Sequence, residues 1–190
     1  SDLIHHHESG IDCLLAPMTP AEVEGIPAAL ITELLQLLRS TYDYVIIDSP
    51  PAFTDTILAA LDLSDTYILV TTPDIPALKN LRITLDTFDE LGYPRSAWQV
   101  VLNRGDSKNG LELEDVERAL GTNVQLIIPQ SADVSRTANR GVPIVSDMPT
   151  HGVSKAIIQL ASMQRGLSGQ SVGAIDARKR KNNGLFSRKG

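Results

Sequence analysis

Residues 42–51 read YDYVIIDSPP, and this stretch decides the fold. Residues 43–48 form a short apolar run rich in β-branched side chains, which predicts a central parallel strand buried on both faces. The strand must end at Ser49, because Pro50 has no N–H for a strand ladder and keeps the preceding residue extended. Asp48 is therefore expected at the carboxyl end of a buried strand, the edge at which open α/β sheets bind ligands.

Two interpretations of Asp48 are open from this stretch alone. A buried carboxylate needs backbone N–H groups, a base or a metal ion, and in nucleotide-hydrolysing folds it holds the magnesium shell, often through water. Alternatively, an aspartate after a strand makes an Asx turn, and the Ser-Pro-Pro sequence at 49–51 is typical of a turn. Only residues further along the chain separate the two interpretations.

The composition is that of a soluble chain that forms one domain. Its 190 residues are enough to bury a sizeable core, and aliphatic residues far outnumber aromatic ones. Cys13 is the only cysteine, which predicts a reducing compartment and a buried, inert thiol. No apolar stretch approaches the ~20 residues that a spanning helix needs, and the first residues do not resemble a signal peptide. We expect a cytoplasmic protein.

The charge is unevenly distributed along the chain. Residues 167–190 contain six basic residues and one acidic residue, a net charge of +5, whereas the whole chain carries −6 and residues 1–166 therefore carry −11. This predicts a disordered basic tail after an acidic domain, and the negative charge of the domain disfavours nucleic-acid binding by it. The tail is compatible with weak contact to an anionic membrane at its inner face. With only two apolar residues nearby, a solvated, solubilising tail is the favoured interpretation.

The sequence predicts strands that alternate with helices along the chain. Residues 1–10 are expected to form an exposed loop, because adjacent histidines such as His5 to His7 do not converge on one metal ion without further ligands. The expected strands, besides 43–48, are 11–16, 67–72, 99–103 and 124–128, and the expected helices are 27–39, 54–61, 76–91, 113–120, 132–139 and 153–163. This order predicts an α/β domain over 11–166 with a mainly parallel, doubly wound sheet and helices on both faces.

Three of the predicted strands end in groups that bind ligands. Right-handed crossovers bring the strand ends to one edge of the sheet, so Asp48, Asn103 and the loop at Pro129 are expected close together. The Asn103 carboxamide can accept from the N6 amine of adenine and donate to N7. Asparagine is also common after strands simply because turns tolerate it. The three groups together favour an adenosine site over that alternative.

The same residues resemble those of the MinD/ParA-type P-loop ATPases. Residues 42–51 are similar to the Walker B and switch II segment of that family, and VLNR at 101–104 is similar to its adenine-reading strand end. Residues 128–129 and ANRGVP at 138–143 resemble its last nucleotide-side loop and helix. The double proline and the Asn-x-Gly-x-Pro ending are most similar to the pilus-assembly branch called CpaE or TadZ. The resemblance covers residues 9–162.

By this resemblance, Asp48 would be the catalytic carboxylate and would hold magnesium through water. Asn103 and Arg104 would lie at the adenine, and Pro129 and Gln130 would line the base pocket, although many relatives carry an acidic residue where this chain has Gln130. The family implies ATP and Mg²⁺ as cofactors, a homodimer in the ATP-bound state and a protein partner in a pilus or division assembly.

One motif of that family is missing from the sequence. A P-loop needs Gly-x-x-x-x-Gly-Lys-[Ser/Thr], and none of the six lysines follows a glycine. We therefore expect the C-terminal part of a positioning ATPase, of the pilus-assembly, septum-site or partitioning type, that lacks its N-terminal P-loop unit. Such a chain is expected to be inactive alone. The alternative is a non-catalytic docking or scaffold module with the same fold.

Overall fold

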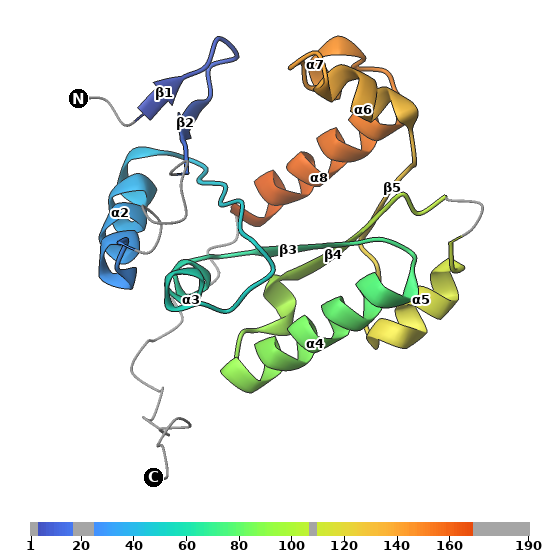
Figure 1. Ribbon diagram of the computed structural model, residues 1–190, viewed down its shortest axis with the longest axis horizontal. Helices are drawn as coiled ribbons and strands as arrows, with labels where there is room; N and C mark the ends of the chain where they lie inside the picture. The colour runs from blue at the N-terminus through green and yellow to red at the C-terminus, as the bar shows by residue number, and fades with distance from the viewer. Residues whose placement is uncertain (1–3, 17–24, 107–109, 169–190) are drawn as a thin grey trace. The chain divides into compact units, whose positions relative to one another are not determined.

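The computed structural model describes residues 4–16, 25–106 and 110–168. These residues form two compact units, one up to Ser64 and the other from Asp65 onward (Figure 1). The disordered basic tail was predicted over 167–190. Residues 167 and 168 belong to a helix, so the prediction is wrong there, and from 169 onward the tail lies outside the described residues and remains a prediction.

The N-terminal unit contains a hairpin and two helices. Strands β1 (Ile4–His6) and β2 (Asp12–Leu14) pair antiparallel, and helices α2 (Ala28–Thr41) and α3 (Asp55–Asp62) contact each other. The prediction of a loop over 1–10 is wrong for β1, because Ile4 and His6 pair with Leu14 and Asp12. Gly10 allows the tight return of the chain through its positive φ of 85°. Cys13, expected to be buried, is only half-buried.

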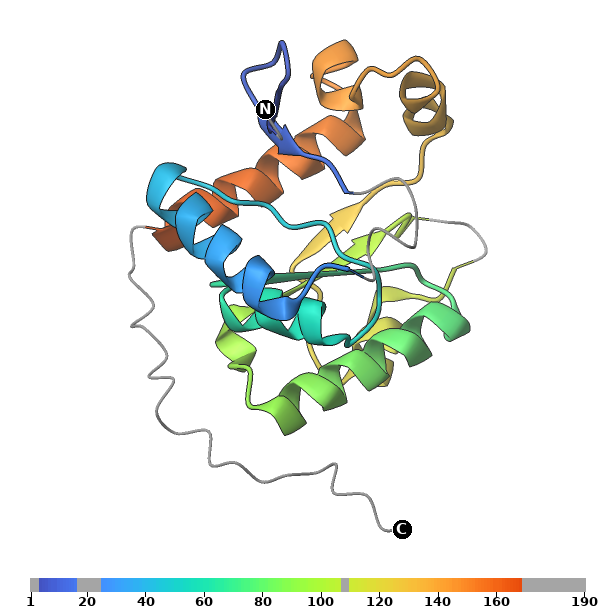
Figure 2. The same cartoon turned by 60° about the vertical axis from the view of Figure 1, so that its left-hand side comes forward.

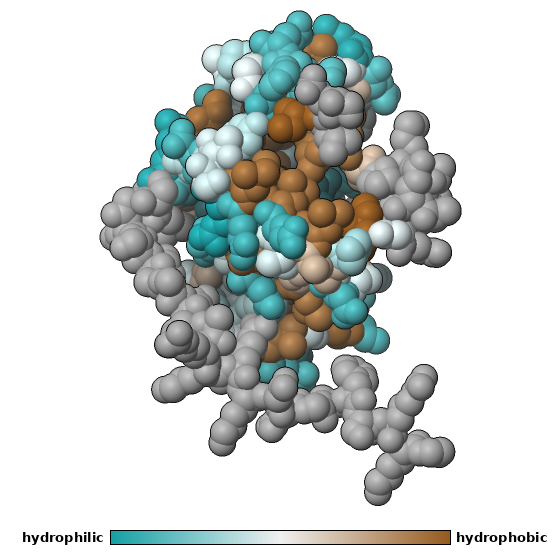
Figure 3. All heavy atoms as spheres, turned by 90° about the vertical axis from the view of Figure 1, so that its left-hand side faces the viewer, coloured by the Kyte–Doolittle hydropathy of each residue, from teal (hydrophilic) through white to brown (hydrophobic). Residues whose placement is uncertain are grey.

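The predicted strand at 43–48 is wrong. This segment belongs to no strand, and Ile46 and Ile47 are 90% and 41% exposed. Its β-branched composition favours extended backbone, yet a strand also needs a neighbour that completes its hydrogen bonds, and none of the described strands pairs with it. Apolar surface is visible on the face of the molecule drawn in Figure 3.

The C-terminal unit contains a parallel three-stranded sheet. Its strands are β3 (Tyr67–Thr71), β4 (Trp98–Asn103) and β5 (Leu126–Ile128), in that spatial order. Helix α4 (Ile75–Leu91) and the short 3-10 helix η1 (Arg95–Ala97) connect β3 to β4, and α5 (Leu113–Leu120) connects β4 to β5. Helices α6 (Ala132–Ala138), α7 (Ile144–Asp147) and α8 (Gly152–Ser168) follow. All strands and helices predicted for this part of the chain are present, and α7 was not predicted.

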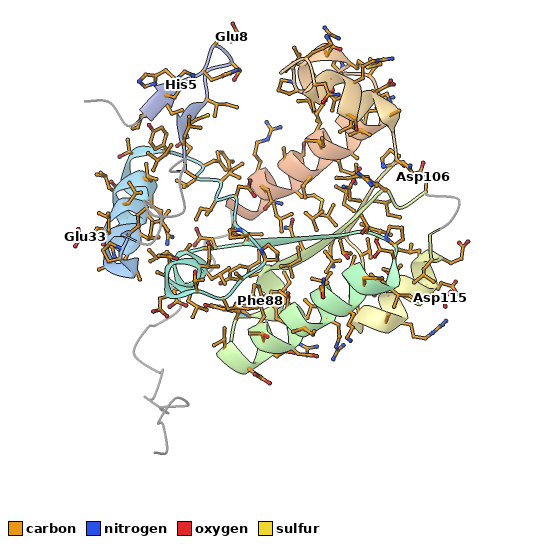
Figure 4. The ribbon with its side chains drawn as sticks, viewed as in Figure 1. His5, Glu8, Glu33, Phe88, Asp106 and Asp115 are labelled. Carbon is orange, nitrogen blue, oxygen red and sulfur yellow. The ribbon has the colours of Figure 1, made fainter. Side chains whose placement is uncertain are left out.

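One face of this sheet packs against α4 and α5 (Figures 1 and 2). Phe88 points from α4 toward the strands (Figure 4), and its ring lies 5.1 Å from that of Tyr67 and 5.9 Å from that of Trp98, between ring centroids. Edge-to-face contacts of this kind add to the free energy gained by burying the rings. The aromatic cluster therefore fixes α4 against the first residues of β3 and β4.

Helix α8 covers part of the opposite face. The Gln164 side-chain amide donates to the carboxamide oxygen of Gln99 on β4 at 2.5 Å, and Val101 on the same strand is completely buried. On β3, by contrast, Ile68 and Val70 are 41% and 59% exposed. The predicted sheet with helices on both faces is thus confirmed in this unit, with β3 the least covered strand.

Local sequence signals fix the helix ends. The Asp74 carboxylate accepts the Ala77 N–H at 3.0 Å and caps the start of α4, which ends at Gly92 with a φ of 77°. Asn139 and Pro143, with Gly141 between them at a φ of 70°, form the connection from α6 to α7. The Asn-x-Gly-x-Pro motif thus builds a turn between two helices, and the glycine is required there because its φ is positive.

Candidate functional site

The carboxyl ends of β4 and β5 lie side by side at one edge of the C-terminal sheet. Asn103, the last residue of β4, pairs with Ile128, the last residue of β5. Pro129 and Gln130 follow Ile128 directly, so the structure brings them beside Asn103. This placement follows from parallel pairing, which puts successive strand ends at the same edge. We call residues 103–106 the β4 turn and residues 128–130 the β5 turn.

Asn103 presents free hydrogen-bonding groups at this edge. Its side chain is half-buried, and within the described part of the chain no hydrogen bond engages its carboxamide. The carboxamide therefore retains an acceptor and two donors for a ligand. Those are the groups that a pair of hydrogen bonds to the N6 and N7 edge of adenine requires.

The backbone of the β4 turn lies close against β5. Arg104 has a φ of 58°, in the left-handed region that residues other than glycine seldom adopt, and its side chain is exposed. The Gly105 N–H donates to the Ile128 carbonyl at 3.1 Å. A Cβ at position 105 would lie 2.5 Å from Cγ2 of Ile127, so the close approach of the two segments requires glycine here.

A second contact joins the two turns through a side chain. The Asp106 carboxylate accepts the Gln130 backbone N–H at 2.5 Å, across 24 residues of sequence. Asp106 is exposed (Figure 4). Asp106 was not predicted as a site residue. The only sequence signal for it is an aspartate three residues after the end of a strand, a position where aspartate often bonds a backbone N–H.

Asp48 lies in the N-terminal unit, in the segment that was predicted to be a strand. Its carboxylate is exposed, and the described residues offer it no hydrogen bond or ion pair. The alternative Asx turn is not formed either. Pro50, two residues after Asp48, has no N–H, and the turn here is closed instead by the Ala52 N–H, which donates to the Pro50 carbonyl at 2.8 Å.

A serine, a histidine and an aspartate meet immediately after the β5 turn. Nε2 of His151 lies 3.3 Å from Oγ of Ser131 and 3.6 Å from Oδ2 of Asp133, and Nδ1 of His151 accepts the Val153 N–H at 3.1 Å. Because Nδ1 uses its lone pair on that N–H, the neutral ring carries its proton on Nε2 and donates it. His151 is therefore arranged to join the starts of α6 and α8, not to activate Ser131 as a nucleophile.

The end of β3 contributes one carboxylate to the same sheet edge. Hydrogen bonds from the Thr72 hydroxyl, at 2.5 Å, and from the Ala77 N–H lower the pKa of Asp74 below its ordinary value. Asp74 is thus held ionised as the cap of α4. The Pro73 carbonyl accepts the Leu111 N–H at 3.0 Å, which joins this loop to the start of α5.

Neither a preformed metal cluster nor a membrane span is found in the described ranges. No three side chains of His, Cys, Asp or Glu gather there in an arrangement that could hold a metal ion. No helix among the described residues is both long and apolar enough to cross a membrane.

Comparison with known proteins gives matches along most of the chain. Residues 9–94 match a family described as AAA domain. The septum site-determining protein MinD of Thermotoga maritima is 29% identical over 130 residues, which are 66% of this chain and 48% of that protein. The chain spans about half the length of the curated relatives that it matches.

Two solved structures share the fold. A ParA family ATPase from Chlorobium tepidum TLS matches with a TM-score of 0.78 at 24% identity, over 84% of this chain and 67% of that one. The septum site-determining protein MinD complexed with Mg-ADP from Pyrococcus horikoshii matches with a TM-score of 0.71 at 23% identity, over 84% of this chain and 65% of that one. At this level of identity the likeness concerns the fold.

Proposed function

We propose that this chain supplies the base-binding part of an ATP-dependent positioning ATPase of the MinD/ParA type, a proposal supported by its similarity to an AAA domain family and to MinD and ParA proteins. The observation that carries this proposal is the position of Asn103. Its unengaged carboxamide lies at the carboxyl edge of a parallel sheet, beside Pro129 and Gln130. In this proposal Asn103 reads the adenine edge, and the β5 turn with Arg104 lines the base pocket.

Asp48 is proposed as the carboxylate that holds Mg²⁺ through water. The residues fit such a role, because Mg²⁺ keeps several waters and takes its remaining ligands from one or two carboxylates and the substrate phosphates. A dedicated cluster of protein ligands is not needed, and none is found among the described residues. Mg²⁺ supplies charge neutralisation on the phosphates when bound, and the exposed Asp48 carboxylate orients its water shell.

The sequence contains no loop of the kind that binds the phosphate groups of a nucleotide. None of the lysines follows a glycine, so no Gly-Lys-[Ser/Thr] motif is present in the 190 residues. The P-loop supplies most of the affinity for a nucleotide triphosphate and much of the charge stabilisation. We therefore propose that this chain alone neither binds Mg-ATP tightly nor hydrolyses it, and that a P-loop unit joins it in the intact ATPase.

The intact ATPase is proposed to act as a switch. It would dimerise in the ATP-bound state and bind a protein partner in a pilus or division assembly, with hydrolysis releasing the partner. The pilus-assembly branch is favoured by the double proline at 50–51 and the Asn-x-Gly-x-Pro motif at 139–143. The cytoplasmic side of the membrane is the proposed location, with weak tail contact to anionic lipid.

A second candidate is a docking module that keeps the fold without nucleotide chemistry. The observation that favours it is an apolar groove of about 350 Å³ at helices α6 and α7. The groove is lined by Val134, Thr137, Ala138, Gly141, Val142, Pro143 and Ile144. Such a surface suits the apolar side chains of a protein partner.

The two candidates differ in whether adenosine binds at Asn103. We expect adenosine, but not guanosine, to shift the NMR amide signals of Asn103, Gly105 and Gln130 in the full 190-residue chain. Asn103→Ala should abolish these shifts, whereas Asn80→Ala, an exposed asparagine on α4, should leave them unchanged. Equal shifts in Asn103→Ala, or none in the wild-type chain, would reject the base-binding role and leave the docking module.

A further inference from the structure

We propose that Asp106 is a positioning residue for base recognition: its carboxylate holds the β5 turn in place against the β4 turn. This inference rests on the proposed function for its ligand, adenosine, but its structural part is testable without any ligand. Asp106 is not expected to touch the base. It acts through the backbone of Gln130, which it bonds at 2.5 Å.

Two hydrogen bonds connect the turns, and they differ in kind. The Gly105 N–H donates to the Ile128 carbonyl at 3.1 Å, a backbone contact that any sequence with the same fold would make. The bond from Gln130 to Asp106 depends on a side chain. Within the described residues it is the one side-chain hydrogen bond between the two turns, so the identity of residue 106 decides whether it exists.

The β5 turn needs an external acceptor. Pro129 has no N–H to donate, and the Gln130 N–H lies beyond the end of β5, where the sheet offers it no partner. The side-chain oxygen of Asp106 supplies this acceptor at 2.5 Å. Asp106 therefore fixes the backbone of Gln130 in place, and with it the point at the sheet edge from which the Gln130 side chain extends.

The hydrogen bond between Asp106 and Gln130 also stabilises the β4 turn. Arg104 is held at a φ of 58°, a conformation that is costly for a residue with a side chain and persists only where its surroundings enforce it. Gly105 on one side and Asp106 on the other are both tied to the β5 turn. The strained residue thus lies next to Asn103, in a turn that is tied to β5 at two successive positions.

Hydrogen exchange of the full chain tests the structural part. In Asp106→Ala the Gln130 amide should exchange about tenfold faster, because it loses a hydrogen bond to a charged acceptor. Asp106→Asn keeps an oxygen acceptor and should remain near the wild-type rate. Asp115→Ala removes an exposed aspartate from α5 (Figure 4) and should change nothing at Gln130. Unchanged Gln130 exchange in Asp106→Ala would overturn the proposal.

Adenosine titration tests the functional part. We expect Asp106→Ala to weaken adenosine binding about fivefold, with Asp106→Asn and Asp115→Ala close to wild type; an unchanged protection of the buried Val101 amide verifies folding. Equal or tighter adenosine binding by Asp106→Ala would overturn the positioning role. If the wild-type chain binds no adenosine, the proposed function fails, while the exchange experiment still decides whether Asp106 holds the two turns together.

Discussion

Arg82 on α4 donates a hydrogen bond from Nη1 to the carbonyl oxygen of Leu120, the last residue of α5, at 2.8 Å. The carbonyls at the end of a helix have no partner within the helix and carry a partial negative charge, so a guanidinium is well suited to this position. The same side chain forms an ion pair with Asp86 one turn along α4. Arg82 thus joins the two helices that cover one face of the sheet.

Arg82→Met should lower the free energy of unfolding by about 1–2 kcal/mol, because a charged hydrogen bond to a part-buried carbonyl is lost. The ion pair with Asp86 is exposed on both sides and adds little. Urea unfolding followed by circular dichroism measures the change. Lys79→Met, an exposed lysine on the same helix, is the matched control, and an equal loss in both variants would show that the contact with Leu120 does not matter.

Ile46→Ala and Val101→Ala should lower the free energy of unfolding by very different amounts, although the sequence predicts both residues in strands. Val101 is completely buried, so its truncation should cost about 2 kcal/mol, whereas Ile46 is 90% exposed and its truncation should cost less than about 0.5 kcal/mol. Chemical denaturation of both variants tests this. A large loss in Ile46→Ala would mean that residues 43–48 are packed as a strand in this chain after all.

Asp74 should make stability depend on pH in acid. Its pKa is lowered in the folded state by the Thr72 hydroxyl and the Ala77 N–H, so its contribution is fully present above the ordinary pKa of 3.8. The contribution is lost as the pH falls from 3.8 through the lowered pKa of the folded state, because the carboxylate of Asp74 binds its proton at a higher pH in the unfolded chain than in the folded one. The stability difference between the wild-type chain and Asp74→Asn should be constant from pH 7 to 5.

Below pH 3.8 that difference should shrink, and unfolding by urea at a series of pH values measures it. The ion pair between Asp89 and Arg95, which also lowers the pKa of its carboxyl group, is common to both proteins and cancels from the comparison. A difference that stays constant down to pH 3 would contradict the hydrogen bonding assigned to Asp74.

Tyr42 should ionise at a higher pH than an ordinary tyrosine. Its hydroxyl donates to Oδ2 of Asp12 at 2.7 Å, and this bond to a carboxylate raises the pKa of Tyr42 above 10.0. Asp12→Asn removes the negative charge and should bring the pKa of Tyr42 back toward its ordinary value. NMR of ring-labelled tyrosine during an alkaline titration measures this shift, and identical curves for both proteins would show that β2 and the end of α2 are not in contact.

Most of the C-terminal unit is predictable from the sequence because its signals are local. The helix from Ile75 to Leu91 is determined by an apolar repeat at helical spacing, a capping aspartate before it and a glycine after it. Each strand is a short apolar run that ends at a polar residue or a proline. Right-handed connections then bring Asn103 beside Pro129 without any knowledge of side-chain contacts.

The error at 43–48 has a different origin. The β-branched residues of this run favour an extended backbone, but they do not define a strand with which it pairs. Strand β1 was missed for a related reason, since His5 and His6 carry no strand signal and the partner strand, predicted at 11–16, lies several residues away. Strand pairing is a property of two segments, so one segment alone does not predict it.

The sequence by itself determined most of the helices and strands from Asp65 onward and which residues reach the carboxyl edge of the sheet, because spacing and capping act within a few residues. Helix α7 and the end of α8 at Ser168 were not among these predictions. Only the tertiary structure decided that Asp106 bonds Gln130, that α8 leaves β3 partly uncovered and that Ile46 is exposed. Those contacts join residues far apart in the chain, so which residues meet depends on how the elements pack and not on signals within a few residues.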